Sequence, residues 1–219
     1  MSNAEKILNL FFPPVCGFCN GINKNFLCDD CRKKFKEIAI STIDNYANEP
    51  VYFDEHYFLL KYETEVREFI LKYKFDEQSY LYKTFARLII EDKNFKENFI
   101  KKYDCIVSVP IHKKRFKTRG YNQSELIARD IAQICEIDFC GNVLIKNKNV
   151  VAQSGLDKLS RVSNIKNAFS AGEGAYKLQG KKVAIFDDIF TTGATTNECA
   201  RVLKMAGVSY VGIFSLAKD

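Results

Sequence analysis

Two patterns of apolar residues alternate over the second half of the chain. Short apolar runs with the composition of buried strands lie at 104–109, 168–170, 183–186 and 209–216. Between them, residues 124–135 and 194–206 carry apolar or small side chains at helical spacing, and Gly207 is placed to end the second helix. Alternation of strands and helices is typical of a mainly parallel sheet with helices on both faces, so we predict an α/β fold.

The first half of the chain has a less regular pattern. Aromatic and β-branched residues within 51–62 predict a strand or a hairpin. Amphipathic spacing predicts helices at 65–73 and 80–91, and shorter helices are expected at about 30–38 and near the start of the chain. No clear linker or internal repeat separates these elements.

The apolar run at 183–186 ends in two carboxylates and leads into a turn that opens a helix. The turn contains Thr191, Thr192, Gly193, Ala194, Thr195 and Thr196. The first N–H groups of a helix have no intrahelical partner and carry the positive end of the dipole, so a phosphate there gains several hydrogen bonds. Asp187 and Asp188 can accept from a vicinal diol or hold the waters of a bound Mg²⁺. The alternative is an acidic strand end before an ordinary capped helix; the whole arrangement favours a sugar phosphate site.

Basic residues are concentrated between the apolar run at 104–109 and the helix at 124–135. The five cations are Lys113, Lys114, Arg115, Lys117 and Arg119. Their uncompensated positive field suits a pyrophosphate better than a monoester. The alternative is a solvated charged face, but the carboxyl end of a strand is where an open α/β sheet carries its ligand loops, so we favour an anion-binding loop.

Four cysteines near the N-terminus form two closely spaced pairs, Cys16 with Cys19 and Cys28 with Cys31. Two such turns can close a tetrahedral set of four thiolates around Zn²⁺. Redox chemistry of a single pair is the rival interpretation, but two adjacent pairs favour a structural zinc site. The other four cysteines, Cys105, Cys135, Cys140 and Cys199, lie in apolar contexts and are expected to be buried side chains.

Composition limits the class of protein. A chain of 219 residues can hold one domain with a sizeable core and a small appendage. The cysteine spacing indicates a reducing compartment, and no signal peptide or bilayer-spanning stretch of about twenty apolar residues is recognised, so we expect a cytoplasmic location without membrane insertion. The net charge of +6 is compatible with nucleic acid but is only a mild bias.

The segment 183–196 resembles the phosphoribosyl pyrophosphate (PRPP) signature of the type I phosphoribosyltransferases. The resemblance implies that Asp187 and Asp188 bind the ribose hydroxyls and that residues 191–196 hold the 5′-phosphate. It also implies Mg²⁺-dependent departure of pyrophosphate, with Lys113, Lys114, Arg115 and Arg119 on the leaving group. Asp187, Asp188 and Arg119 are then the expected catalytic residues.

Together with residues 119–123 and 153–164, this signature makes nearly the whole chain resemble the ComF family of competence-linked phosphoribosyltransferase-like proteins. The resemblance implies a zinc knuckle at 1–40, a phosphoribosyltransferase-like domain at 41–219 and a role in DNA uptake. The wider phosphoribosyltransferase superfamily has a mobile loop in this region that closes over the substrate, which implies that role for the segment with Gln153, Lys158 and Arg161. The alternative is a polar surface helix with salt bridges.

Three functions are compatible with these features. The first is pentosyl transfer from PRPP to an acceptor, the second is PRPP sensing without turnover, and the third is an adaptor that binds single-stranded DNA and DNA-uptake proteins. The second and third can hold together. The sequence displays no acceptor pocket and no signal of oligomeric state.

Overall fold

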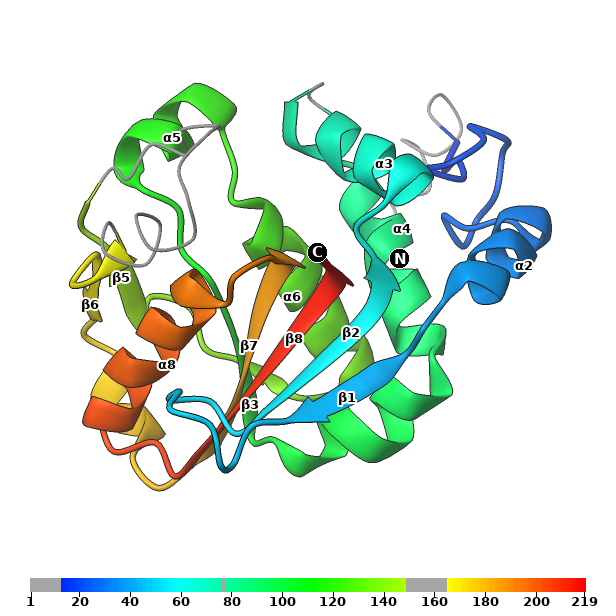
Figure 1. Cartoon of the computed structure of the whole chain (residues 1–219). Coiled ribbons are helices and arrows are strands. Elements are labelled where there is room, and N and C mark those ends of the chain that lie inside the picture. Colours follow the sequence, from blue (N-terminus) through cyan, green and yellow to red (C-terminus); the bar gives the residue numbers. More distant parts are fainter. Residues whose placement is uncertain (1–12, 76–77, 149–164) are drawn as a thin grey trace.

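A six-stranded sheet forms the centre of the molecule, with its strands in the order β1-β2-β8-β7-β3-β4 (Figure 1). The computed structural model describes residues 13–75, 78–148 and 165–219. Within these ranges the sheet consists of β1 (Thr42–Asn45), β2 (Glu55–Lys61), β3 (Cys105–Ser108), β4 (Asp138–Phe139), β7 (Lys182–Phe190) and β8 (Tyr210–Lys218). A separate antiparallel pair is formed by β5 (Leu144–Lys146) and β6 (Phe169–Ala171).

Helices flank this sheet. They are α2 (Asp29–Ile38), α3 (Thr64–Phe75), α4 (Leu81–Glu91), α5 (Lys113–Arg119), α6 (Gln123–Cys135) and α8 (Ala194–Met205). A π turn at Phe95–Phe99 and 3-10 turns at Ile100–Lys102 and Ala175–Leu178 complete the described elements. The helices predicted at 30–38, 65–73, 80–91, 124–135 and 194–206 are therefore confirmed, whereas the helix expected near the start of the chain lies outside the described residues.

The pairing of the strands brings their carboxyl ends to one edge of the sheet. β2 pairs with β8, β8 with β7, β7 with β3 and β3 with β4, all in parallel, and only β1 is antiparallel to its neighbour. The predicted α/β architecture with a mainly parallel sheet flanked by helices is confirmed. In Figure 1 this edge lies at the top, with α3 on one side and α5 on the other.

Two apolar cores cover the two faces of the sheet. Ala184 and Phe186 of β7 pack in the core under α3, α4 and α6, while Val183 and Ile185 pack in the core under α8. Alternate strand residues point to opposite faces, so one buried run serves both cores. Phe186 is fully buried, and its truncation to alanine would cost about 3–5 kcal/mol.

The strand predicted within residues 51–62 is confirmed by β2 (Glu55–Lys61), but residues 51–53 lie outside it and the antiparallel partner of β2 lies earlier in the chain. Thr42 to Asn45 pair antiparallel with β2, whereas Phe53 packs as a buried side chain in the core under α8. The backbone N–H of Tyr52 donates to Asn197 Oδ1 at 2.7 Å instead of joining a sheet. Tertiary contacts thus override the β propensity of this segment.

The basic segment after β3 is also different from the expectation, because it is a helix and not a loop. In α5 the ring Nδ1 of His112 accepts from the N–H of Lys114 at 3.2 Å and caps the first turn. Gly120 adopts a left-handed conformation with φ of +83° and donates to Phe116 O at 2.7 Å. Lysine and arginine are good helix formers, and these two caps let a seven-residue helix form.

Candidate functional site

The two acidic residues lie inside β7, which continues two residues beyond them to Phe190. Asp187 Oδ1 accepts from Ser124 Oγ at 3.3 Å and from the N–H of Asp188 at 3.0 Å. Asp188 is buried, with 7% of its surface exposed, and its Oδ2 lies 2.8 Å from Lys74 Nζ. The acids therefore lie near the carboxyl end of the strand, as predicted, but the strand continues to Phe190 before the turn begins.

The turn between β7 and α8 forms a small pocket at the carboxyl edge of the sheet. It is lined by Asp187, Ile189, Phe190, Thr191, Gly193, Ala194, Thr195 and Thr196. The N–H of Ala194 donates to Thr192 Oγ1 at 3.3 Å, and Thr196 Oγ1 donates to Gly193 O at 3.0 Å. The structure thus brings the predicted turn residues, the helix start and Asp187 together.

Aromatic rings pack against Phe190, at the end of β7, next to this turn. The ring of Phe190 lies 4.0 Å from that of His56, and Phe53 meets it edge-on at 6.0 Å. His56 is fully buried and its Nε2 lies 2.9 Å from Ser215 Oγ. Burial and the charge of Lys218 lower the pKa of His56 to about 3, so the imidazole is neutral at physiological pH.

Burial and the neighbouring Asp188 raise the pKa of Asp187 to about 7. The positive charges of Lys74 and Lys146 act in the opposite direction. Lys146, on β5, has a pKa lowered by its own burial, and the charge of Asp187 counteracts that effect. No motif in the sequence contains Ser124, Lys74 or Lys146, so they were not predicted as site residues; only the fold brings them to the acids.

The basic helix α5 overhangs the same edge of the sheet (Figure 1). Lys113, Lys114, Arg115 and Lys117 are exposed on it, and Phe116 is 48% exposed. Arg119 is less exposed, and its pKa is lowered by burial and by Arg115, while the charge of Asp188 raises it. Arg119 is therefore the cation of α5 that the structure places in the field of the acidic pair.

The segment with Gln153, Lys158 and Arg161 lies outside the described residues, so its expected closure over the substrate stays a prediction.

A second cavity, of about 380 Å³, adjoins the carboxyl ends of β2 and β8. It is lined by Phe58, Lys61, Tyr62, Glu63, Lys218 and Asp219. The N–H of Asp219 donates to Phe190 O at 2.9 Å, which links this cavity to the strand that carries the acids. No motif in the sequence predicted this pocket.

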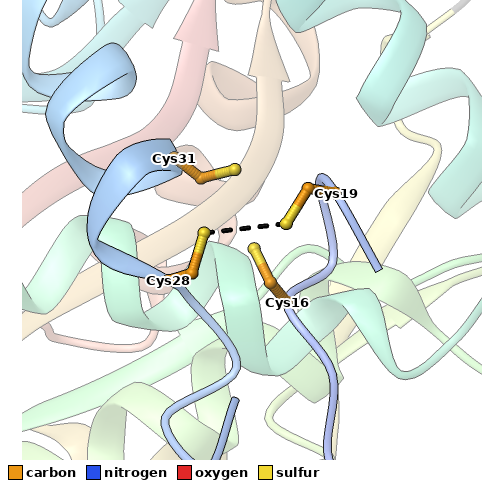
Figure 2. A group of neighbouring side chains, drawn as sticks. All are labelled: Cys16, Cys19, Cys28 and Cys31. Atoms are coloured by element: carbon orange, nitrogen blue, oxygen red, sulfur yellow. Dashed lines mark hydrogen bonds between the residues drawn. The ribbon is translucent and has the colours of Figure 1, made fainter. Parts of the chain in front are cut away.

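The four N-terminal cysteines converge on one point (Figure 2). Their Sγ atoms all lie within 4.8 Å of one another, and those of Cys19 and Cys28 are 3.6 Å apart. Four sulfurs bound to one Zn²⁺ at ~2.3 Å in a tetrahedron lie about 3.8 Å apart, so this cluster fits such an ion. Cys28 is the residue that precedes α2, and Cys31 lies in the first turn of that helix.

The cysteine cluster is fixed to the core by aromatic packing and hydrogen bonds. The ring of Phe18 lies 4.0 Å from Phe35 and 4.5 Å from Phe69, so it joins α2 to α3. Gly17 N donates to Thr84 Oγ1 at 3.2 Å, and Thr84 Oγ1 donates to Phe26 O at 2.7 Å. The metal-binding turn therefore packs directly on α4.

The remaining cysteines only partly match their expected burial. Cys105 and Cys199 are buried, while Cys135 and Cys140 are partly exposed at the margin of the cores. Among the described residues, no helix combines the length and the apolar character required to cross a membrane.

Comparison with known proteins identifies relatives along almost the whole chain, although no family model matches it. Competence protein F of Haemophilus influenzae is 30% identical over 227 residues, which cover 95% of this chain and 98% of that protein. Competence protein ComFC of Streptococcus pneumoniae is 27% identical, over 93% of this chain and 80% of its own length. Among solved structures, adenine phosphoribosyltransferase from Thermoanaerobacter pseudethanolicus gives a TM-score of 0.41 at 14% identity, covering 85% of this chain and 99% of that one.

Proposed function

The chain belongs to the ComF family of competence proteins, and from this premise we propose that it binds PRPP at the carboxyl edge of its sheet and acts in DNA uptake. The observation that carries the proposal is the juxtaposition of Asp187 and Asp188 with the turn that opens α8. Carboxylates for a ribose diol and the first N–H groups of a helix for a phosphate lie on consecutive segments of the chain.

Each part of the site has a defined role in this proposal. Asp187 and Asp188 accept hydrogen bonds from the ribose hydroxyls and orient the ring. The N–H groups at the start of α8 and the hydroxyls of Thr191, Thr192 and Thr195 hold the 5′-phosphate. The cations of α5, among them Arg119, whose pKa the charge of Asp188 raises, neutralise the charge that grows on the pyrophosphate as it leaves C1′.

Magnesium fits the same site, since carboxylate oxygens are the ligands it prefers and the consecutive strand residues Asp187 and Asp188 supply them. When bound, Mg²⁺ supplies charge neutralisation to the pyrophosphate group. The cavity beside Phe58 and Tyr62 is the proposed position of the acceptor, because its aromatic rings and its charged groups suit a planar polar molecule.

Zinc is the metal that we propose for the four cysteines. A set of four thiolates closes the coordination sphere and leaves no position for a substrate, so the ion has a structural role. Four reduced thiols that bind a metal ion require a reducing compartment, and this requirement supports a cytoplasmic location.

A titration calorimetry experiment tests PRPP binding. PRPP is titrated into the zinc-loaded chain with and without Mg²⁺, and a pyrophosphate-release assay with a panel of acceptors follows. The expected result is saturable PRPP binding by the native chain. Asp187→Asn and Asp188→Asn should each weaken it by about tenfold or more, because each substitution removes one charge-assisted hydrogen bond. Binding that is absent in the native chain, or unchanged in both variants, would contradict the proposal.

A second candidate function is that of an adaptor that binds single-stranded DNA. The exposed cations of α5 together with the exposed Phe116 favour it, since basic grooves and stacking rings are what single strands require. Binding of a labelled oligonucleotide is expected to weaken steeply with salt, to survive Asp187→Asn and to be lost with the zinc cysteines. Loss of binding in Asp187→Asn would instead indicate that DNA and PRPP share one site.

A further inference from the structure

Lys74, at the end of α3, holds one of the two acids in a buried ion pair. Its Nζ lies 2.8 Å from Asp188 Oδ2, and the side chains are only 20% and 10% exposed. An ion pair on an open surface contributes little, because water and salt screen both charges. This pair is largely shielded, so removing one partner leaves a charge with poor solvation.

The end of α3 is fixed in place by the residues around Lys74. Tyr73 Oη donates to Gln123 O at 2.9 Å, and Tyr121 Oη donates to Tyr73 O at 3.0 Å. Tyr73 is fully buried against Phe85, with ring centroids 5.4 Å apart. The backbone that carries Lys74 is therefore tied to the start of α6, and the ammonium group is held at the acids and does not merely reach them from a flexible surface.

In the absence of PRPP, the ion pair limits which ligands the two acids can bind. Asp187 is already engaged by Ser124 Oγ and by the N–H of Asp188, and Asp188 is engaged by Lys74. A divalent cation approaching the two carboxylates would meet the positive charge of Lys74, which is already in contact with Asp188 Oδ2. A ribose hydroxyl would have to compete with the same ammonium for Asp188 Oδ2.

We propose that Lys74 is a built-in counter-ion of the acidic pair, which keeps free divalent cations out of the empty site and yields Asp188 only to a cation that arrives with a sugar diphosphate. This inference rests on the proposed function, because it concerns the order in which PRPP and Mg²⁺ enter the same site. After entry, the diphosphate offers the ammonium of Lys74 a new anion, so its charge remains compensated.

The test is a titration of Mn²⁺, without PRPP, into the zinc-loaded full chain at pH 8. Electron paramagnetic resonance measures how much Mn²⁺ is bound. The native chain is expected to bind Mn²⁺ weakly, and Lys74→Met to bind it about tenfold more tightly or better, since methionine keeps the length of the side chain but removes the charge. Lys74→Arg is expected to behave as the native chain. Lys72→Met is a matched control on the same helix, because Lys72 is exposed and pairs with the ring of Phe69, and it should leave Mn²⁺ binding unchanged.

Asp188→Asn in the Lys74→Met background should abolish the gain, which assigns the bound Mn²⁺ to this site. The inference is overturned if Lys74→Met, with native circular dichroism and zinc content, binds Mn²⁺ no more tightly than the native chain. It is also overturned if the native chain already binds Mn²⁺ alone as tightly as that variant. Because no PRPP is present, a failure of PRPP binding in the calorimetric experiment is recognised separately from a failure here.

Discussion

A Cβ atom on Gly193 would lie only 2.6 Å from Cζ of Phe190. The turn that opens α8 therefore rests directly on the Phe190 ring, and this ring in turn stacks on the buried His56. Gly193 also has a φ of +72°, in the left-handed region that favours glycine. The position of the proposed phosphate site is thus determined by the end of β7 and by β2, and not by the turn alone.

Replacement of Gly193 by alanine should damage both the fold and the phosphate site. The positive φ costs about 1 kcal/mol for any residue with a Cβ, and the contact with Phe190 adds about 1–3 kcal/mol because the ring cannot move away from His56. We expect a loss of stability in urea denaturation and PRPP binding that is weaker by about tenfold or more.

Gly180→Ala is the matched control for this experiment. Gly180 has a φ of +75°, but a Cβ there would meet no atom within 4 Å. It should show the cost of the positive φ, about 1 kcal/mol, with unchanged PRPP binding. Equal losses of stability and binding in both alanine variants would contradict the supporting role of Phe190.

The raised pKa of Asp187 predicts a pH dependence of stability. Its ordinary value of 3.8 applies to the unfolded chain, whereas burial and Asp188 raise the pKa to about 7 in the fold. Between these values the folded chain keeps a proton that the unfolded chain has lost, so this group makes stability fall as pH rises, by at most ~1.4 kcal/mol per pH unit. Below the lower value its effect is absent, and above the higher one the full penalty is present.

Asp187→Asn removes this titration while keeping an oxygen that can accept from Ser124. In magnesium-free buffer the variant should be more stable than the native chain at pH 8, by about 1–3 kcal/mol, and the difference should shrink towards pH 4. Chemical denaturation at several pH values measures it. A difference that stays constant across this range would show that the carboxyl group is not the source.

The metal site makes a prediction of its own. The native chain should contain one zinc ion, and Cys16→Ser should lose it together with several kcal/mol of stability, because Cys16 is buried in the same core as Phe35. Zinc content by mass spectrometry and thermal unfolding measure the two effects. Cys140→Ser, at a cysteine outside the cluster, should retain the metal; if it lost zinc as well, the four-cysteine assignment would be wrong.

Local patterns predicted the parts of the site that are contiguous in the sequence. The acids, the turn and α8 follow one another along the chain, so their spacing alone indicated a phosphate site, and the paired cysteines likewise indicated their cluster. Lys74 and Lys146 come from α3 and β5, and their approach to Asp187 and Asp188 depends on how whole elements pack. No local pattern carries that information.

Two departures of the structure from the expected elements have similar physical causes. Residues 51–53 have strand-forming side chains, yet Phe53 is used to cover Phe190, and β1 supplies the strand instead. The basic segment 113–119 was expected to be a loop because of its charge and its place after a strand, but its helix propensity and its two caps decide its conformation. In both segments tertiary contacts or local caps decide the backbone structure, and composition alone does not show them.

Thr84 connects the zinc-binding turn with α4 through a single hydroxyl, which accepts from Gly17 N at 3.2 Å and donates to Phe26 O at 2.7 Å. Thr84→Val keeps the shape of the side chain but removes both of these hydrogen bonds, so that Gly17 N retains only its 3.3 Å bond to Phe26 O. We expect a loss of about 1–3 kcal/mol in unfolding free energy and faster zinc release to a chelator.

Thr84→Ser retains the hydroxyl and should restore most of the stability and the slow zinc release. PRPP binding should be unchanged in both variants, because Thr84 belongs to the helical layer that anchors the knuckle and not to the carboxyl edge of the sheet. If Thr84→Val released zinc at the native rate, the turn would be held by the aromatic rings around Phe18 alone. If it also weakened PRPP binding, the knuckle and the acidic site would be coupled through α4 and α3, the helix that carries Lys74.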